Sequence, residues 1–376
     1  MSSPASGEQP SGNDVASAAA GYGPLAMEAL SVSKDFRLSR GLTVHAVREV
    51  SFSLYRGAVV ALVGESGSGK STVARLLAGQ ERLTSGLIRL DGQPVDVSSG
   101  RNFRRYKSEV QLVFQDPFSS LNPVHTVRYH LGRPVRLHRG VTSGTQVQQE
   151  ITALLEQVRL TPGEHFIGKY PHELSGGQRQ RVSFARALAA RPSVLLADEP
   201  VSMLDVSIRL EMLNLLDDLR QRFQLALLYI THDIASARYF ANEVLVMYSG
   251  RVVERGPAEE VTQHPAHPYT QLLVASAPDP DNLGSTLRAA VKHNGAAKPA
   301  EGGAHNADAK QNGRQPAQAT QAAGGCLFSH RCPLADDRCR REDPPLLRIS
   351  AVRAAACWRL DVAAPEVLAG PQGGGT

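Results

Sequence analysis

The feature that most constrains this chain is a glycine-rich octapeptide, GESGSGKS, at residues 64–71. It follows the apolar run 58–63 and leads into the segment 72–78, an order that predicts a buried strand, a tight turn and a helix. Glycines let the backbone curl until successive N–H groups point inward, and the helix start adds the positive end of its dipole. The stretch therefore predicts a polyphosphate-binding loop made of Gly64, Glu65, Ser66, Gly67, Ser68, Gly69, Lys70, Ser71 and Thr72.

Two side chains at the end of this loop have the chemistry that a nucleoside triphosphate needs. Lys70 would reach the β- and γ-phosphates, and the Ser71 hydroxyl would bind Mg²⁺, which takes hard oxygen ligands. An ordinary Gly/Ser turn is the alternative interpretation. The strand before the loop and the helix after it favour nucleotide binding.

Composition restricts the class of protein. With 376 residues, 42% of them hydrophobic and 20% charged, the chain is long enough to bury a substantial core. It has no apolar run of about 18 to 20 residues and no basic start before an apolar stretch, so we expect a soluble protein without a membrane span or signal peptide. A net charge of +5 permits a membrane surface or nucleic acid as a neighbour but indicates neither.

Polar side chains follow three of the apolar runs that resemble strands. Asp198 and Glu199 end one run, where the first carboxylate would lie near Mg²⁺ and the second would accept a proton from the attacking water. Gln115 ends another, where its carbonyl could bind Mg²⁺ or hold a water, although a Gln there is more often a plain loop residue. His232 ends the third, at the edge that carries the nucleotide in α/β sheets, although such a His is more often structural. The expected Mg²⁺ ligands are Ser71, Gln115 and Asp198.

Another helix start has the features of an anion site. Ser175 and Gln178 have the spacing of a capping box, with Gly176 and Gly177 between them. A merely capped helix is the alternative. Asp205 opens a later helix, and Phe36, upstream of the loop, could stack on adenine or be a core residue.

These motifs, in this order and spacing, resemble the ATP-binding-cassette (ABC) ATPases over about residues 27–276. The resemblance implies an α/β nucleotide-binding domain, with a RecA-like phosphate-loop core, an antiparallel β subdomain and a helical subdomain at about 118–190. It also implies that two cassettes sandwich ATP between one phosphate loop and the partner's Ser175–Gln178 segment. The roles that it implies are general base for Glu199, γ-phosphate sensor for His232, Mg²⁺ and coupling residue for Gln115, and dimer communication for Asp205.

Two further segments, residues 114–123 and 264–273, resemble the oligopeptide/dipeptide importer ATPases, a group that includes relatives for nickel and glutathione. Met203 and Ala58 depart from the usual residues, but neither is expected to touch a phosphate. The resemblance implies an ATPase subunit on the cytoplasmic face of the inner membrane. Its expected partners are a second cassette, by family habit a different chain, two integral permease subunits and an external solute-binding protein, with no nucleic acid.

The four cysteines of the chain all lie in its C-terminal part: Cys326, Cys332, Cys339 and Cys357, separated by five, six and seventeen residues. In a cytosolic ATPase they indicate a local metal or cluster site rather than disulfides, but the spacing lacks the short pair typical of zinc sites. The block resembles the Cys-rich extension of the peptide-importer ATPases, some of which carry a 4Fe-4S cluster. Zinc and free thiols remain alternatives.

The resulting interpretation is an importer ATPase that couples ATP hydrolysis to peptide uptake. Nickel, glutathione or another small solute is the alternative within transport, and a soluble ABC ATPase acting on ribosomes or DNA is the alternative outside it. The expected parts are a disordered start at 1–24, the ATPase domain at 25–276, a flexible linker at 277–325, the Cys-rich extension at 326–361 and a disordered tail at 362–376.

Overall fold

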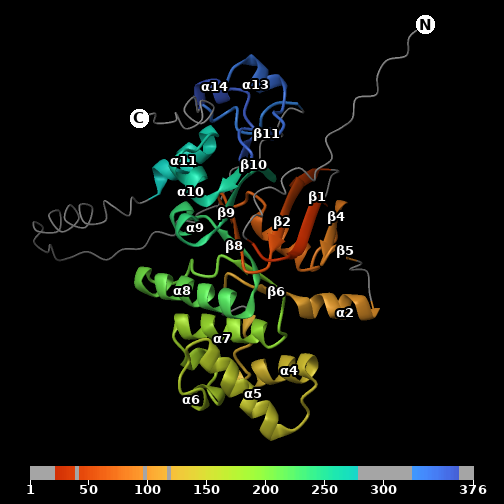
Figure 1. The fold of residues 1–376 in the computed structure, drawn as a ribbon, viewed down its shortest axis with the longest axis vertical. Coiled ribbons are helices and arrows are strands. Elements are labelled where there is room, and N and C mark those ends of the chain that lie inside the picture. Colours follow the sequence, from red (N-terminus) through yellow and green to blue (C-terminus); the bar gives the residue numbers. More distant parts are fainter. Residues whose placement is uncertain (1–21, 39–41, 96–99, 117–119, 278–323, 364–376) are drawn as a thin grey trace, which may run out of the picture.

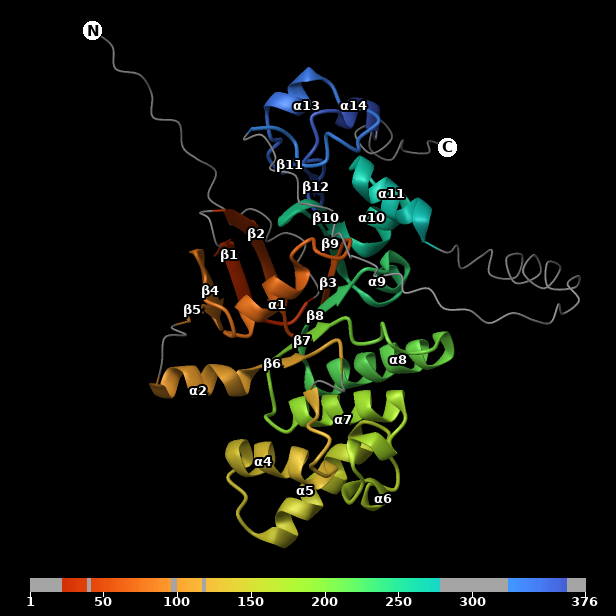
Figure 2. The same cartoon turned by 180° about the vertical axis from the view of Figure 1, so that it is seen from behind.

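The computed structural model describes residues 22–38, 42–95, 100–116, 120–277 and 324–363. Within these residues the chain forms a four-stranded sheet, an eight-stranded sheet and a group of helices at one end of the molecule (Figure 1). Residues 324–363 lie at the opposite end, as the view from behind also shows (Figure 2). The α/β fold with antiparallel and helical parts is therefore as the sequence predicts.

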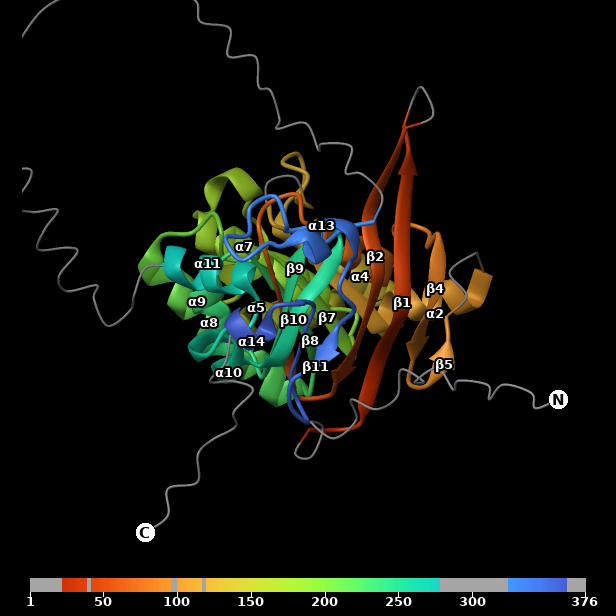
Figure 3. The same ribbon diagram turned by 90° about the horizontal axis from the view of Figure 1, so that it is seen from above.

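The four-stranded sheet is antiparallel and stands beside the larger sheet (Figure 3). Its order is β2-β1-β4-β5, and the two long strands β1 and β2 pair with each other. A turn at Asp91 and Gly92 joins β4 to β5, and these residues have positive φ angles of 46° and 75°. The strands are β1 (Leu25–Arg37), β2 (Thr43–Tyr55), β4 (Ser85–Leu90) and β5 (Gln93–Pro94).

The eight-stranded sheet has the order β11-β12-β10-β9-β3-β8-β7-β6. The neighbouring pairs from β9 to β6 are all parallel, so the carboxyl ends of these strands meet at one edge. Every residue of β3 is buried, and alternate residues pack into two different hydrophobic clusters, one on each face of the sheet. The strands are β3 (Val59–Val63), β6 (Val110–Val113), β7 (Val194–Asp198), β8 (Ala226–Thr231), β9 (Glu243–Tyr248), β10 (Arg251–Pro257), β11 (Leu347–Arg348) and β12 (Ala354–Ala355).

The helices cover the sheets and build the separate helical group. That group consists of α4, α5, α6 and α7 and lies within the predicted helical region, of which residues 117–119 fall outside the described residues. No helix in the described part of the chain is both long and apolar enough to cross a bilayer. The helices are α1 (Lys70–Leu77), α2 (Gly100–Glu109), α4 (Val127–Arg139), α5 (Gly144–Gln157), α6 (Glu164–Ile167), the 3₁₀ turn η3 (Pro171–Glu173), α7 (Gly176–Leu188), α8 (Val206–Phe223), α9 (Ile234–Phe240), α10 (Ala258–Gln263), α11 (Pro268–Ser276), α13 (Asp337–Arg341) and α14 (Leu360–Ala363).

The Cys-rich extension continues the larger sheet. Its strand β12 pairs antiparallel with β10, with Ala355 opposite Glu254, and β11 pairs with β12. A buried ion pair reinforces the junction, since Arg353 Nη2 donates to Glu254 Oε1 at 3.0 Å. The sequence does not reveal this attachment, because two-residue strands leave no periodic pattern.

The ends of the ordered structure differ slightly from the sequence expectation. The start predicted as disordered and the predicted linker fall mostly outside the described residues, as does the tail from 364 onward. Gly23, however, donates its N–H to Arg56 O at 3.1 Å, which ties the end of the predicted disordered start to β2. Ala363 belongs to α14, and its carbonyl accepts from Gln271 Nε2 at 2.7 Å. These single long-range hydrogen bonds extend the order beyond what composition predicts.

Candidate active site

The glycine-rich loop lies between β3 and α1, which begins directly after Gly69. Close packing fixes both ends of the loop: a Cβ on Gly64 would lie 2.2 Å from Met247 O, and one on Gly69 would lie 2.2 Å from Ala46 O. Gly69 also has a φ of 104° and the exposed Gly67 a φ of 80°, values that favour glycine. The backbone is therefore held at its ends and open at its middle.

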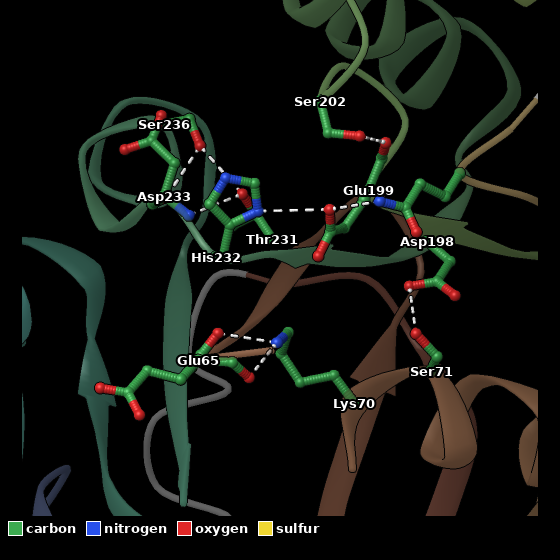
Figure 4. A network of polar contacts seen from close by, with 12 residues as sticks. Glu65, Lys70, Ser71, Asp198, Glu199, Ser202, Thr231, His232, Asp233 and Ser236 are labelled. Carbon is green, nitrogen blue, oxygen red and sulfur yellow. Dashed lines mark hydrogen bonds and ion pairs between the residues drawn. The ribbon is translucent and has the colours of Figure 1, made fainter. Parts of the chain in front are cut away.

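Lys70 is folded into this loop. Its Nζ donates to Gly64 O at 2.7 Å and to Glu65 O at 2.9 Å (Figure 4), and the residue is only 4% exposed. Burial lowers the pKa of Lys70, while Glu199 and Asp198 act in the opposite direction. The Lys70 ammonium group thus has two acidic neighbours, Asp198 at the end of β7 and Glu199 directly after it.

Ser71 and Asp198 meet at the start of α1. The Ser71 hydroxyl donates to Asp198 Oδ1 at 3.1 Å, and Asp198 is 6% exposed. Burial raises the pKa of Asp198, and the Ser71 hydrogen bond partly offsets this effect. Two hard oxygen ligands therefore lie together beside the phosphate loop, as a Mg²⁺ site needs.

Glu199 shares one carboxylate oxygen between two partners. Its Oε2 accepts from Gln115 Nε2 at 2.9 Å and lies 3.2 Å from His232 Nδ1 (Figure 4). Its φ of 45° is unusual for a residue with a side chain, and its N–H is held by Ile230 O at 2.9 Å. The carboxylate is 14% exposed and His232 is 57% exposed, so the pair faces open space.

The predicted residues thus form two adjoining sets. Lys70, Ser71 and Asp198 surround the phosphate loop, and Gln115 and His232 converge on Glu199. Gln115, expected as a third Mg²⁺ ligand, donates to Glu199 in this arrangement. The first set can bind a metal–polyphosphate, and the second can hold a water near a carboxylate base.

Phe36 lies near the end of β1, which pairs with β2. It is opposite Val44 in the pairing of β1 with β2, two residues from Ala46, whose carbonyl packs on Gly69. Its ring is partly exposed and carries Lys34 Nζ at 4.8 Å from the ring centroid. A base stacked on this ring would therefore have a cation beside it.

The predicted capping box forms at the start of α7. Gln178 N donates to Ser175 Oγ at 3.3 Å and Ser175 N donates to Gln178 Oε1 at 3.0 Å, which confirms the capping box. A Cβ on Gly177 would lie 3.1 Å from Ile208, and one on Gly176 would lie 3.7 Å from Leu204. This helix start therefore lies next to α8, whose N-cap is the exposed Asp205.

The four cysteines line one small cavity with His267, Phe328 and Trp358. All four are free thiols, and in the described part of the chain no group of three or more His, Cys, Asp or Glu side chains is arranged to hold a metal ion. Burial raises the pKa of the Cys357 thiol to about 11, and its three Cys neighbours add to this effect. Four thiols around one cavity are a donor set for a positively charged metal group, which would favour their thiolate forms.

Two residues that touch the loop have no role in the sequence analysis. Tyr269 lies in the 264–273 segment, and its hydroxyl accepts from Glu65 N at 2.8 Å. Arg331, next to Cys332, donates to both carboxylate oxygens of Glu65. The 264–273 segment was singled out by resemblance alone, and nothing in the sequence marks Arg331.

Comparison with known proteins agrees with this geometry. The ABC transporter family model matches residues 47–202, and the model for the oligopeptide/dipeptide transporter C-terminal region matches residues 253–303 and 296–339. A probable peptide ABC transporter ATP-binding protein of Sinorhizobium fredii is 41% identical, over 84% of this chain and 82% of its own length. A di/tripeptide transport ATP-binding protein of Pseudomonas aeruginosa is 39% identical, over 88% of this chain and 96% of its own.

Solved structures show the same cassette. The cbiO1 protein of Clostridium perfringens, part of an ABC transporter complex, has a TM-score of 0.56 and 28% identity, over 64% of this chain and 91% of its own. The ATP-binding cassette MJ0796, a dimer bound to ADP and Pi, also has a TM-score of 0.56 and 28% identity, over 62% of this chain and 98% of its own. The chain therefore belongs to the ATP-hydrolysing, ATP-binding subunits of ABC transporters, in the family that carries the oligopeptide/dipeptide transporter C-terminal region.

Proposed function

We propose that this chain hydrolyses ATP at the site around Lys70 and Glu199 to drive peptide import. Lys70 binds the β- and γ-phosphates, while Ser71 and Asp198 hold Mg²⁺ directly or through water. Glu199 orients the attacking water and accepts its proton, and His232 contacts the γ-phosphate. The observation that carries the proposal is the convergence of Gln115 and His232 on the Glu199 carboxylate beside the phosphate loop.

Gln115 links chemistry to transport in this proposal. It donates to Glu199 now and would exchange this bond for Mg²⁺ when nucleotide binds. It lies two residues after the end of β6, in the stretch of chain that connects this strand to the helical group. The helical group would transmit the change to a permease.

The solute class follows from the relatives. Peptide and di/tripeptide are the words in the names of the relatives from Sinorhizobium and Pseudomonas, and Bacillus subtilis has an oligopeptide transport relative that is 37% identical over 88% of this chain. Peptides are therefore proposed ahead of nickel, glutathione or another small solute. The complex would contain two membrane-spanning permeases at the cytoplasmic face of the inner membrane and receive solute from an external binding protein.

A second cassette would complete each ATP site. The anion-binding start of α7 lies beside Leu204 and Ile208 and serves a phosphate of the partner cassette in this proposal. Asp205, exposed at the start of the next helix, would report on that contact. Family habit favours a partner cassette that is a different chain, and Phe36 would stack on the adenine of the chain's own ATP.

For the cysteines we propose a 4Fe-4S cluster held by Cys326, Cys332, Cys339 and Cys357, with zinc as the alternative. The support is that all four thiols line one cavity. When bound, such a cluster would supply a rigid covalent anchor for the extension. Iron, sulfide and zinc analysis of anaerobically purified protein tests this proposal, with Cys339→Ser as the comparison. Zinc at one equivalent without iron would decide for the alternative, and neither metal would decide for free thiols.

The first experiment is affinity purification of the Glu199→Gln variant from detergent-solubilised membranes with ATP present. This variant keeps the phosphate loop but loses the base, so it should trap ATP-bound complexes. Recovery of two multi-span permeases and a second cassette is the expected result. Recovery of ribosomal or DNA-repair proteins from the soluble fraction, without membrane subunits, would overturn the transport proposal.

A further inference from the structure

The extension reaches the phosphate loop through the side chain of Arg331. Arg331 lies in the segment between Cys326 and Cys332, 266 residues after Glu65, the second residue of the loop. Its Nη1 donates to Glu65 Oε2 at 2.8 Å and its Nη2 to Glu65 Oε1 at 2.9 Å. This is the bidentate arrangement in which the planar guanidinium fixes a carboxylate most firmly.

Glu65 is held at its backbone as well. Its N–H donates to the Tyr269 hydroxyl at 2.8 Å, and its carbonyl accepts from Lys70 Nζ at 2.9 Å. The same residue therefore joins α11 and the extension to the lysine that the proposed reaction uses. Loss of the Arg331 contact would free the Glu65 side chain, while its backbone N–H and carbonyl would stay bonded to Tyr269 and Lys70.

Packing against aromatic rings restricts the position of the Arg331 guanidinium. Arg331 lies over the rings of Tyr248, at 5.9 Å from the guanidinium carbon to the centroid, and Phe328, at 5.7 Å. Those rings pack on each other with centroids 5.3 Å apart, and Tyr269 packs against both. Phe328 is buried, so the segment that carries Arg331 is anchored before it reaches the loop.

We propose that Arg331 is a positioning residue for ATP binding, through which the Cys-rich extension holds the phosphate loop in its binding conformation. The inference rests on the proposed function of the loop. A loop that is already shaped loses less conformational freedom when the triphosphate binds, so affinity gains while the chemical step is unchanged. Arg331 directly precedes Cys332, so the residue that holds Glu65 is a neighbour in sequence of one of the four cysteines.

Loss of the Arg331 side chain should weaken nucleotide binding by a modest factor. Arg331 and Glu65 are 37% and 42% exposed, so their ion pair is partly screened, but its bidentate geometry places it at the stronger end of such pairs. Arg331→Gln should therefore weaken nucleotide binding by about two- to five-fold. The KM for ATP should rise by that factor, and kcat should stay unchanged because Lys70, Glu199 and His232 are untouched.

The test measures Mg-ADP affinity, KM and kcat for the full chain and for the variants Arg331→Gln, Arg331→Lys and Arg340→Gln. Arg340 lies in the same extension but pairs only with the exposed Asp337 in the described residues, so Arg340→Gln should match the unchanged chain. Arg331→Lys keeps the charge but loses the bidentate contact, so its ADP affinity should lie between those of Arg331→Gln and the unchanged chain. The reversed pair Glu65→Arg with Arg331→Glu should bind better than Glu65→Arg alone.

A second readout does not depend on turnover. Trp358 is the only tryptophan and lies in the extension, so its fluorescence follows unfolding of that part. If the loop and the extension are coupled, Mg-ADP must stabilise the extension, and Arg331→Gln must reduce that stabilisation. Equal ADP affinity and equal ADP-dependent shifts in both proteins would overturn the inference. Absence of nucleotide binding to the unchanged chain would instead overturn the proposed function of the loop.

Discussion

Removal of the Arg353 charge should loosen the extension from the cassette. Glu254 has no exposed surface, and Arg353 is 5% exposed. Glu254 accepts from Arg353, from Ala266 N at 2.9 Å and from His267 N at 2.8 Å. Burial raises the pKa of Glu254, and Arg353 and the backbone donors oppose that effect. Arg353→Met would leave a buried carboxylate without the charge of Arg353, while the backbone donors at Ala266 and His267 remain.

The size of the loss follows from that geometry. Removing one partner of a buried ion pair costs about 3–5 kcal/mol, because the other charge stays uncompensated. The two backbone donors to Glu254 remain, so we expect the low end, about 3 kcal/mol. With a urea slope of about 3 kcal/mol per molar, the unfolding midpoint would fall by about 1 M.

Urea unfolding followed by Trp358 fluorescence measures this loss of stability in the extension, where Trp358 lies. Glu254→Gln combined with Arg353→Met removes both charges and keeps one amide oxygen for the backbone donors. The double variant should therefore be more stable than the sum of the single effects predicts, by about 1 kcal/mol or more. Additive losses, or a midpoint within about 0.2 M of the unchanged chain, would refute the assignment of an anchoring role to the pair.

Three further predictions concern the phosphate loop, the proposed γ-phosphate contact and the response of stability to acid. Gly64→Ala should abolish measurable ADP binding, because its Cβ would lie 2.2 Å from Met247 O. Gly67→Ala should weaken ADP binding less, because no atom lies within 4 Å of the added Cβ. Equal losses of ADP affinity in the two variants would contradict the packing argument. His232→Ala should lower kcat by about 10²-fold with ADP affinity unchanged, as steady-state kinetics and calorimetry can show, and an unchanged kcat would exclude the proposed γ-phosphate contact. His267 is buried and its pKa is lowered to about 4 from 6.5, so the unfolded chain binds its proton first as pH falls. Stability should thus be fully present above pH 6.5 and decline by about 3 kcal/mol between pH 6.5 and 4, a decline that His267→Gln should remove from the Trp358 unfolding curves.

The loop and its partners could be predicted because their signals are local. Residues 64–71 form a strand end, a turn and a helix start whose shape depends on their own glycines. The same holds for the capping box at Ser175, which involves residues three apart. The meeting of Asp198 with Ser71 follows from the parallel strands, whose carboxyl ends share one edge.

The role of Gln115 illustrates a limit of that reasoning. A polar residue at a strand end can be assigned to the edge of the sheet, but its partner depends on side-chain rotation. The sequence analysis groups Gln115 with the Mg²⁺ ligands, and the structure has it donating to Glu199. In our proposal, binding of Mg-ATP would replace the contact with Glu199 by one with Mg²⁺.

The extension shows where the limit lies. Its cysteines mark it in the sequence, yet its attachment depends on contacts between residues about 90 to 270 positions apart, such as Arg353 with Glu254 and Arg331 with Glu65. Nothing in the sequence around Arg331 or Arg353 predicts a partner different in kind from that of the exposed Arg340. What distinguishes them is the partner: one meets a fully buried carboxylate and stabilises the junction, and the other meets the phosphate loop. The same type of side chain thus anchors the extension at one point and, in our inference, uses that anchor to position the nucleotide site at another.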